Sequence, residues 1–164
     1  MDLVNELAEL AVATRLKRLS DRLSNDVSKI YKESDVDFEA RWFLILSILE
    51  KEKLMAITAI ADSLQLTHPA IIQLVQELEK KKLIKASIDK NDGRKRMVSL
   101  TASGKKTLAQ IEPVLMSIKA ENKKWIEAAS ANILDVLTEL EQSLTDQSMY
   151  HRIKLNILQQ KPGQ

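Results

Sequence analysis

The chain has 164 residues, of which 45% are hydrophobic and 4% aromatic, and its formal net charge is +2 at pH 7. Such a chain can bury one domain core, and the few aromatic residues, three glycines and three prolines favour long helices over a β-sandwich. Cysteine is absent, which excludes disulfides and thiolate chemistry, and two histidines so far apart in sequence, His68 and His151, do not indicate a zinc site.

The N-terminal residues lack the basic region of a signal peptide. The longest apolar run, residues 42–49, is much shorter than the roughly 20 residues needed to cross a bilayer. We therefore expect a cytoplasmic protein that does not associate with a membrane.

Apolar residues recur at spacings of three and four from Leu3 to about Tyr31, which predicts one long amphipathic helix. Its apolar face is larger than a small core needs, so we expect it either to form part of a subunit interface or to be an ordinary core helix. A second helix is predicted over 38–51, with Asp35 or Asp37 as its cap. Its centre is apolar nearly all round, which indicates burial.

A short helix over 59–64 and a longer one over 68–82, capped by Thr67, follow in sequence. The longer helix places Ile71, Leu74 or Val75, and Leu78 on one face. Four residues lie on or near the opposite face: His68, Ile72, Gln73 and Gln76. These form either a recognition surface or an ordinary solvated helix face, and His68 alternatively packs on Pro69.

Residues 84–88 and 95–100 alternate like two strands, and Asp92-Gly93 between them indicates a hairpin, because this pair readily adopts positive φ angles. Thr101 is expected to cap a helix that runs to Ile126 and is kinked by Pro113. Two further helices are predicted over 132–144 and 149–158.

Positive charge is concentrated in one quarter of the chain. Residues 67–106 carry ten Lys or Arg against four Asp or Glu, whereas the segments on either side are slightly acidic. A basic cluster of this kind suits either phosphate neutralisation or a solvated surface with no partner.

The hairpin and the start of the next helix are similar to the MarR family of winged-helix regulators. The matching residues are Asp92-Gly93-Arg94 and then Val98-Ser99-Leu100-Thr101-Ala102-Ser103-Gly104. Two positions depart from the family pattern: Lys82 stands where glycine usually ends the recognition helix, and Ala86 where a basic residue is common.

Three other segments, Arg15–Asp21, Asp37–Phe43 and Leu66–Ala70, resemble the regulator halves of proteins in which a MarR-type domain precedes a GNAT acetyltransferase domain. No such second domain is present up to Gln164. We expect either a stand-alone relative or a regulatory fragment of an acetyltransferase fusion.

The resemblance implies a mainly α fold with a small β wing, in which residues 34–104 form a winged helix-turn-helix DNA-binding domain and residues 1–33 and 105–164 form a helical dimerisation region. It implies a homodimer that binds a pseudo-palindromic operator in double-stranded DNA. The residues expected at the major groove are Thr67, His68, Ile72, Gln73 and Gln76.

At the wing, Arg94 is the candidate for the minor groove, with Asp92 orienting it, and Lys90, Lys95 and Arg96 are expected on the DNA backbone. The alternative for Arg94 is a solvated loop residue. By analogy with the family, Arg41 and Trp42 are candidates for lining an effector pocket, with Arg41 attracting an anion. Arg41 could equally pair with Asp37 or Glu39, and Trp42 could be a core residue.

The leading hypothesis is a ligand-responsive transcriptional repressor, and the alternative is a protein-interaction module. An enzyme is not expected: the three glycines lie far apart, so no loop can cradle a cofactor, and no nucleophile-base set is visible. We expect no cofactor and no metal.

Overall fold

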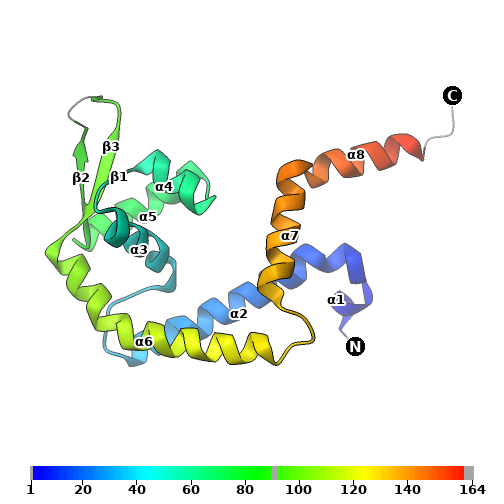
Figure 1. Ribbon diagram of the computed structural model, residues 1–164, viewed down its shortest axis with the longest axis horizontal. Coiled ribbons are helices and arrows are strands. Elements are labelled where there is room, and N and C mark those ends of the chain that lie inside the picture. Colours follow the sequence, from blue (N-terminus) through cyan, green and yellow to red (C-terminus); the bar gives the residue numbers. More distant parts are fainter. Residues whose placement is uncertain (1, 90–91, 161–164) are drawn as a thin grey trace. The chain divides into compact units, whose positions relative to one another are not determined.

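A computed structural model describes residues 2–89 and 92–160, which form helices and one small sheet (Figure 1). The N-terminal elements are α1 (Leu3–Glu6), the 3-10 helix η1 (Ala8–Ala11), α2 (Val12–Glu33), a second 3-10 helix η2 (Ala40–Trp42) and α3 (Phe43–Glu52). The next are β1 (Met55–Ala56), α4 (Ile57–Leu64), α5 (His68–Lys80), β2 (Ile84–Ile88) and β3 (Arg96–Leu100). The last are α6 (Ala102–Glu127), α7 (Ile133–Asp146) and α8 (Met149–Gln159). The expected class, mainly α with a small β wing, is confirmed.

The chain divides into two compact units, Met1–Met116 and Ser117–Gln164. The first contains all the described strands and helices α1 to α5. The second contains the end of α6 together with α7 and α8. None of the helices in the described ranges is long and apolar enough to cross a membrane.

The core of the first unit is built from helix faces and from both strands of the β2–β3 hairpin. Its fully buried side chains include Trp42, Ile45, Leu46, Ile60, Ile71, Val75, Leu78, Val98 and Ile111. Burial of each aliphatic side chain stabilises the fold by roughly 1.5–3 kcal/mol. In α5 the buried set is Ile71, Val75 and Leu78, so Val75 rather than Leu74 completes the inner face.

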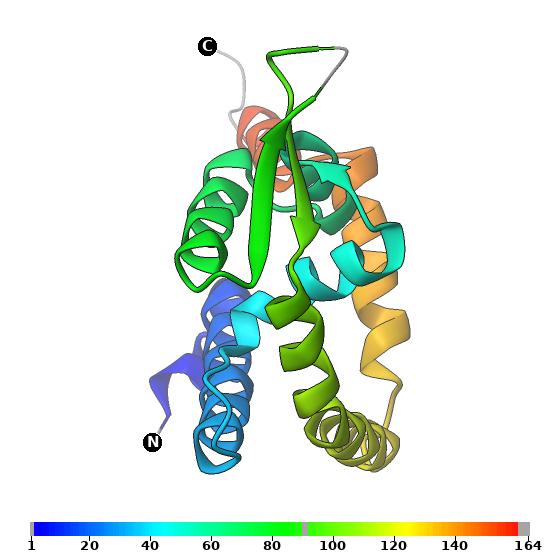
Figure 2. The same cartoon turned by 90° about the vertical axis from the view of Figure 1, so that its left-hand side faces the viewer.

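The sheet is antiparallel with the order β1-β3-β2. Ile84 pairs with Leu100 at the base of the β2–β3 hairpin, and Ile88 pairs with Arg96 towards its tip. Ile84 is buried, whereas Ile88 is 70% exposed although both lie on the same face. Figure 2 shows that the outer part of the hairpin extends beyond the end of α5. This position accounts for the exposure of Ile88.

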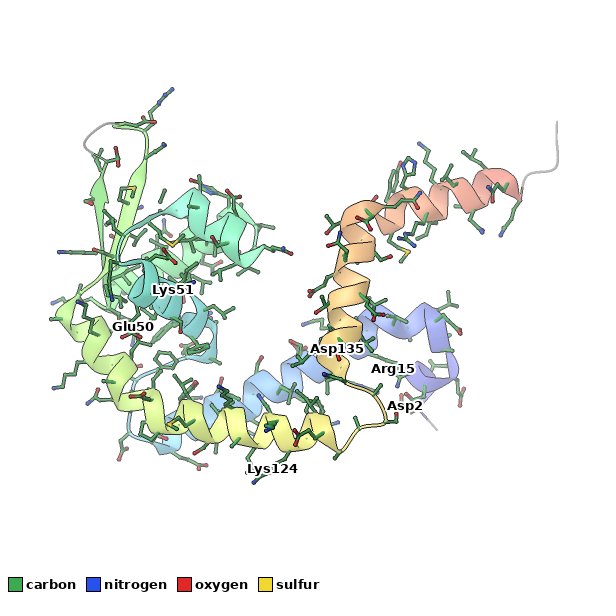
Figure 3. All side chains as sticks on the ribbon, viewed as in Figure 1. Asp2, Arg15, Glu50, Lys51, Lys124 and Asp135 are labelled. Atoms are coloured by element: carbon green, nitrogen blue, oxygen red, sulfur yellow. The ribbon has the colours of Figure 1, made fainter. Side chains whose placement is uncertain are left out.

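The prediction of one continuous helix from Leu3 to Tyr31 was wrong in its first part. Ala8 adopts a left-handed backbone conformation (φ 46°), which separates α1 from η1 and α2. The reversal buries Ala11 and brings Asp2, labelled in Figure 3, within 3.1 Å of the Arg18 guanidinium. At the N-terminal end of the chain these tertiary contacts, and not the helical period of the sequence, determine the backbone conformation.

The predicted caps had different outcomes. Neither Asp35 nor Asp37 caps α3, which begins at Phe43 behind η2. Instead, the Asp37 carboxylate accepts a hydrogen bond of 2.6 Å from Lys81 Nζ. Thr101 does cap α6, since its hydroxyl oxygen accepts a hydrogen bond of 3.0 Å from the N–H of Gly104.

Helix α5 ends in a Schellman motif, at Lys80 rather than at the expected Lys82. The N–H of Leu83 donates to the carbonyl of Leu78 (2.9 Å), and the N–H of Lys82 donates to that of Glu79 (2.8 Å). This motif requires a left-handed residue at position 82, and Lys82 accordingly has φ 59°. A lysine therefore adopts the conformation for which glycine is the usual residue.

Gly104 is required by a close backbone approach. A Cβ atom at this position would lie 2.1 Å from the carbonyl oxygen of Leu83, which is far inside van der Waals contact. The same oxygen accepts a hydrogen bond of 3.0 Å from the N–H of Thr101. The first turn of α6 is thus held directly against the segment that joins α5 to β2.

We expect Lys82→Gly to stabilise the protein by about 0.5–1 kcal/mol. A left-handed conformation costs a non-glycine residue about 1–2 kcal/mol, and part of the gain is offset by the greater freedom of glycine in the unfolded chain. Urea denaturation measures the change. As a control, Lys80→Gly changes the last residue of α5, which does not have a positive φ, and should destabilise the protein by about 0.5–1 kcal/mol. Equal destabilisation by both variants would contradict the strain assigned to Lys82.

Candidate nucleic-acid interface

Helices α4 and α5 form the helix-turn-helix. Gln65 ends α4 in the left-handed conformation (φ 50°), and the N–H of Leu66 donates to the carbonyl of Ala61 (3.0 Å). Thr67 then takes extended backbone angles at the N-cap of α5, but its side chain makes no capping hydrogen bond. The turn is therefore fixed by backbone contacts, and the exposed Thr67 hydroxyl is not used by the helix it precedes.

The outer face of α5 presents the side chains expected there. His68, Gln73 and Gln76 are exposed, and Ile72 is half-buried at the edge of this face. Because Ile71, Val75 and Leu78 are completely buried, the rotation of α5 about its own axis is fixed. A solvent-exposed strip that carries two amides and an imidazole is available for contact with base edges.

The wing tip is organised by Asp92. Its carboxylate accepts hydrogen bonds from the backbone N–H (3.1 Å) and from Nε (3.2 Å) of Arg94. The N–H of Asp92 in turn donates to the carboxylate of Asp89 (2.9 Å). The Arg94 side chain is 93% exposed, so Asp92 orients a guanidinium that projects into solvent.

The expected turn geometry was only partly correct. The N–H of Lys95 donates to the carbonyl of Asp92 (2.9 Å), which closes a tight turn around Gly93. Gly93 does not adopt a positive φ, and nothing would obstruct a Cβ atom there. Lys90, one of the expected backbone contacts, lies outside the described residues.

The two basic residues that follow Arg94 differ in their surroundings. The Lys95 side chain is exposed. Arg96, by contrast, forms an ion pair through Nη2 with the carboxylate of Glu79 on α5. Arg96 therefore ties the wing to the recognition helix, a role that the sequence pattern did not indicate.

Arg41 and Trp42 lie in a network with Glu77 of α5. Trp42 is buried and its Nε1 donates to the carboxylate of Glu77 (3.3 Å). Arg41 pairs with Glu39 (2.9 Å) and with the same Glu77 oxygen (3.2 Å). Of the open alternatives for these residues, pairing with Glu39 and core burial are therefore realised, and Asp37 instead pairs with Lys81.

A surface hollow of about 500 Å³ lies along α2. Its lining residues are Ala13, Thr14, Lys17, Arg18, Asp21, Arg22 and Asn25. Neither Arg41 nor Trp42 contributes to this hollow.

Residues 36–95, from the segment before η2 to the wing, match the family model described as "MarR family". This segment is therefore similar to the MarR family. MarR-family proteins are transcription regulators. The curated proteins contain no match to the chain.

Solved MarR-type structures share the fold. A mutant of MarR from E. coli in complex with operator DNA matches with a TM-score of 0.68 and 17% identity, over 88% of this chain and 99% of that one. The PcaV regulator of Streptomyces coelicolor, in complex with its natural ligand, matches with a TM-score of 0.66 and 18% identity, over 90% of this chain and 97% of that one. BpsR of Bordetella bronchiseptica, whose DNA binding is regulated by 6-hydroxynicotinic acid, matches with a TM-score of 0.56 and 18% identity, over 79% of this chain and 98% of that one.

Lys95 and Arg96 of the wing are expected to contribute differently to DNA binding, because only Arg96 pairs with Glu79. Each lysine that neutralises a phosphate contributes about −0.9 to the slope of log affinity against log salt. We expect Lys95→Ala to make the slope less steep by about this amount, and Arg96→Ala to change it much less because Arg96 is already paired with Glu79. Anisotropy titrations at several salt concentrations measure both slopes. Equal changes would mean that Arg96 leaves Glu79 and contacts phosphate.

Proposed function

We propose that the protein is a homodimeric, sequence-specific regulator that represses transcription by occupying a pseudo-palindromic operator. The observation that carries the proposal is the pairing, within one unit, of the exposed polar face of α5 with an Arg94-tipped wing. A helix fixed by burial of its inner face and a cationic loop beside it suit adjacent major and minor grooves.

Exposed apolar surface at both ends of the chain supports the dimer. In the N-terminal region Leu3, Leu7, Leu10, Val12 and Leu16 are all exposed. Helices α7 and α8 contain no buried residue, yet Leu134, Leu140, Leu144, Ile153, Ile157 and Leu158 are large and apolar. Monomeric proteins rarely expose such surface. We assign residues 1–33 and 105–164 to dimerisation and residues 34–104 to DNA binding.

In this proposal each side chain of α5 and the wing makes a different contact with DNA. Gln73 makes a bidentate contact with adenine, Gln76 and His68 reach neighbouring base edges, and Ile72 contacts a thymine methyl group. Thr67 holds a phosphate at the start of α5. Arg94 enters the minor groove, while Lys90 and Lys95 contact the backbone.

We expect Gln73→Ala to relax preference at one base pair per half-site, with about 1–3 kcal/mol less discrimination against the wrong base. Arg94→Ala should instead weaken binding to all duplexes and reduce the salt slope by about one. Fluorescence anisotropy with the upstream duplex, single-base variants and a scrambled duplex separates these effects. Equal binding of the wild-type protein to all duplexes would contradict sequence-specific recognition and favour a protein-interaction module.

We further propose that an anionic effector binds at Arg41. The guanidinium is half-exposed and is held by two carboxylates, Glu39 and Glu77, so a ligand carboxylate could replace either of them. BpsR, which responds to an aromatic acid, supports this class of ligand. Release from DNA requires that the acid bind the DNA-free geometry more tightly than the DNA-bound one.

The first probe is 6-hydroxynicotinic acid, followed by other small aromatic acids. We expect an effective acid to lower operator affinity by about 5- to 150-fold. Arg41→Gln should remove this response while leaving operator binding measurable. A panel of acids that leaves the affinity unchanged, or an unchanged response of Arg41→Gln, would contradict the assignment of Arg41.

A further inference from the structure

The connector between α2 and α3, residues 34–42, is held against the recognition helix at two points one helical turn apart. Glu77 and Lys81 are spaced by four residues, which places them on the same side of the helix end. Glu77 contacts Arg41 and Trp42, whereas Lys81 contacts Asp37. We name these five residues the connector clamp.

The contact to Glu77 joins a buried group to a charged network. The Trp42 ring is fully buried, so its N–H needs an acceptor inside the protein, and the Glu77 carboxylate supplies one. The same oxygen forms an ion pair with Arg41, whose Nη2 lies 3.2 Å away. Because Glu77 is largely covered, with 28% of its side chain exposed, this interaction is screened less than the exposed ion pairs.

The contact to Lys81 adds a second anchor. Lys81 Nζ lies 2.6 Å from the Asp37 carboxylate and 5.8 Å from the centre of the Trp42 ring. Two contacts on one helix resist rotation of the connector about either of them. A single contact would not.

The clamp is continuous with α2 through aromatic packing. Tyr31, at the end of α2, packs edge-on against Phe38 with ring centres 4.8 Å apart, and Phe38 packs against Trp42 at 6.0 Å. Tyr31 and Trp42 are both almost completely buried. A displacement of the end of α2 would therefore reach Glu77 through packed rings.

We propose that Glu77 and Lys81 are positioning residues that fix the orientation of α5 relative to α2, and thereby set the half-site separation that the dimer accepts. This inference rests on the proposed function, since it concerns a dimer whose first helices form the interface. Neither residue reads a base or a phosphate. Their effect on DNA binding is exerted through the connector.

The test uses the full-length protein and an operator obtained by selection from randomised duplexes. Binding is measured to this operator, to versions with one base pair inserted or deleted between the half-sites, and to a duplex with a single half-site. One added base pair shifts the second half-site by about 3.4 Å and rotates it around the duplex axis. Spacing preference therefore reports the geometry of the dimer and not the contacts of one recognition helix.

The test variants are Glu77→Ala and Glu77→Gln, since glutamine can still accept the Trp42 N–H but cannot pair as a charge with Arg41. The matched control is Glu52→Ala, which removes an exposed ion pair within α3 to Lys51, labelled in Figure 3, and lies outside the residues assigned to dimerisation. Thermal unfolding verifies that each variant is folded. If Glu77→Ala does not fold, Glu77→Gln carries the test.

We expect Glu77→Ala to weaken binding to the full operator by about 2- to 30-fold and to flatten the spacing preference. Binding to the single half-site should change less than about twofold, and Glu77→Gln should show a smaller effect in the same direction. Equal losses of affinity for the single half-site and for the full operator, or a spacing profile of Glu77→Ala like that of Glu52→Ala, would overturn this inference but not the proposed function. A wild-type protein without any spacing preference would overturn the two-half-site function, and the inference with it.

Discussion

The backbone of Leu83 is the point at which the parts of the winged helix-turn-helix are joined. Its N–H closes the end of α5 by donating to Leu78, and its carbonyl oxygen accepts the N–H of Thr101 at the start of α6. Gly104 lies against the same oxygen without room for a side chain. The recognition helix, the base of the wing and the long helix α6 therefore share one small set of backbone contacts. Their mutual arrangement depends on two residue choices, a residue that tolerates positive φ at position 82 and glycine at position 104.

Local pattern was sufficient to predict the parts of this unit that are governed by local rules. The period of Ile71 and Leu78 placed α5 and its inner face, and the alternation around Asp92-Gly93 placed the hairpin. The hydroxyl of Thr101 was recognisable as a cap. The reversal at Ala8 was not predictable in this way, because the helical period continues through it and the contact of Asp2 with Arg18 spans sixteen residues.

In the candidate site, too, features set by local sequence were predictable, whereas features set by tertiary contacts were not. Exposure of Gln73, Gln76 and Arg94 follows from their places on a helix and at a turn. The partners of the charged residues do not follow, because Arg96 meets Glu79 across 17 residues and Lys81 meets Asp37 across 44. Counting charge in the basic segment therefore overstates the positive charge that is free for phosphates. At least two of its ten cations are paired with carboxylates on other elements.

Because Lys82 has a left-handed backbone conformation, the stability of the end of α5 is expected to depend on ionic strength. Lys80, Lys81 and Lys82 stand together where the helix dipole leaves partial negative charge, so their attraction to the helix end offsets part of the conformational cost at position 82. Salt screens that attraction, but it does not relieve a strained φ angle. The recognition helix should therefore lose stability at its C-terminal turn as salt rises, in the same range of salt over which cations compete for DNA phosphates. For the operator binding proposed above, fraying of this turn and loss of phosphate contacts would act in the same direction.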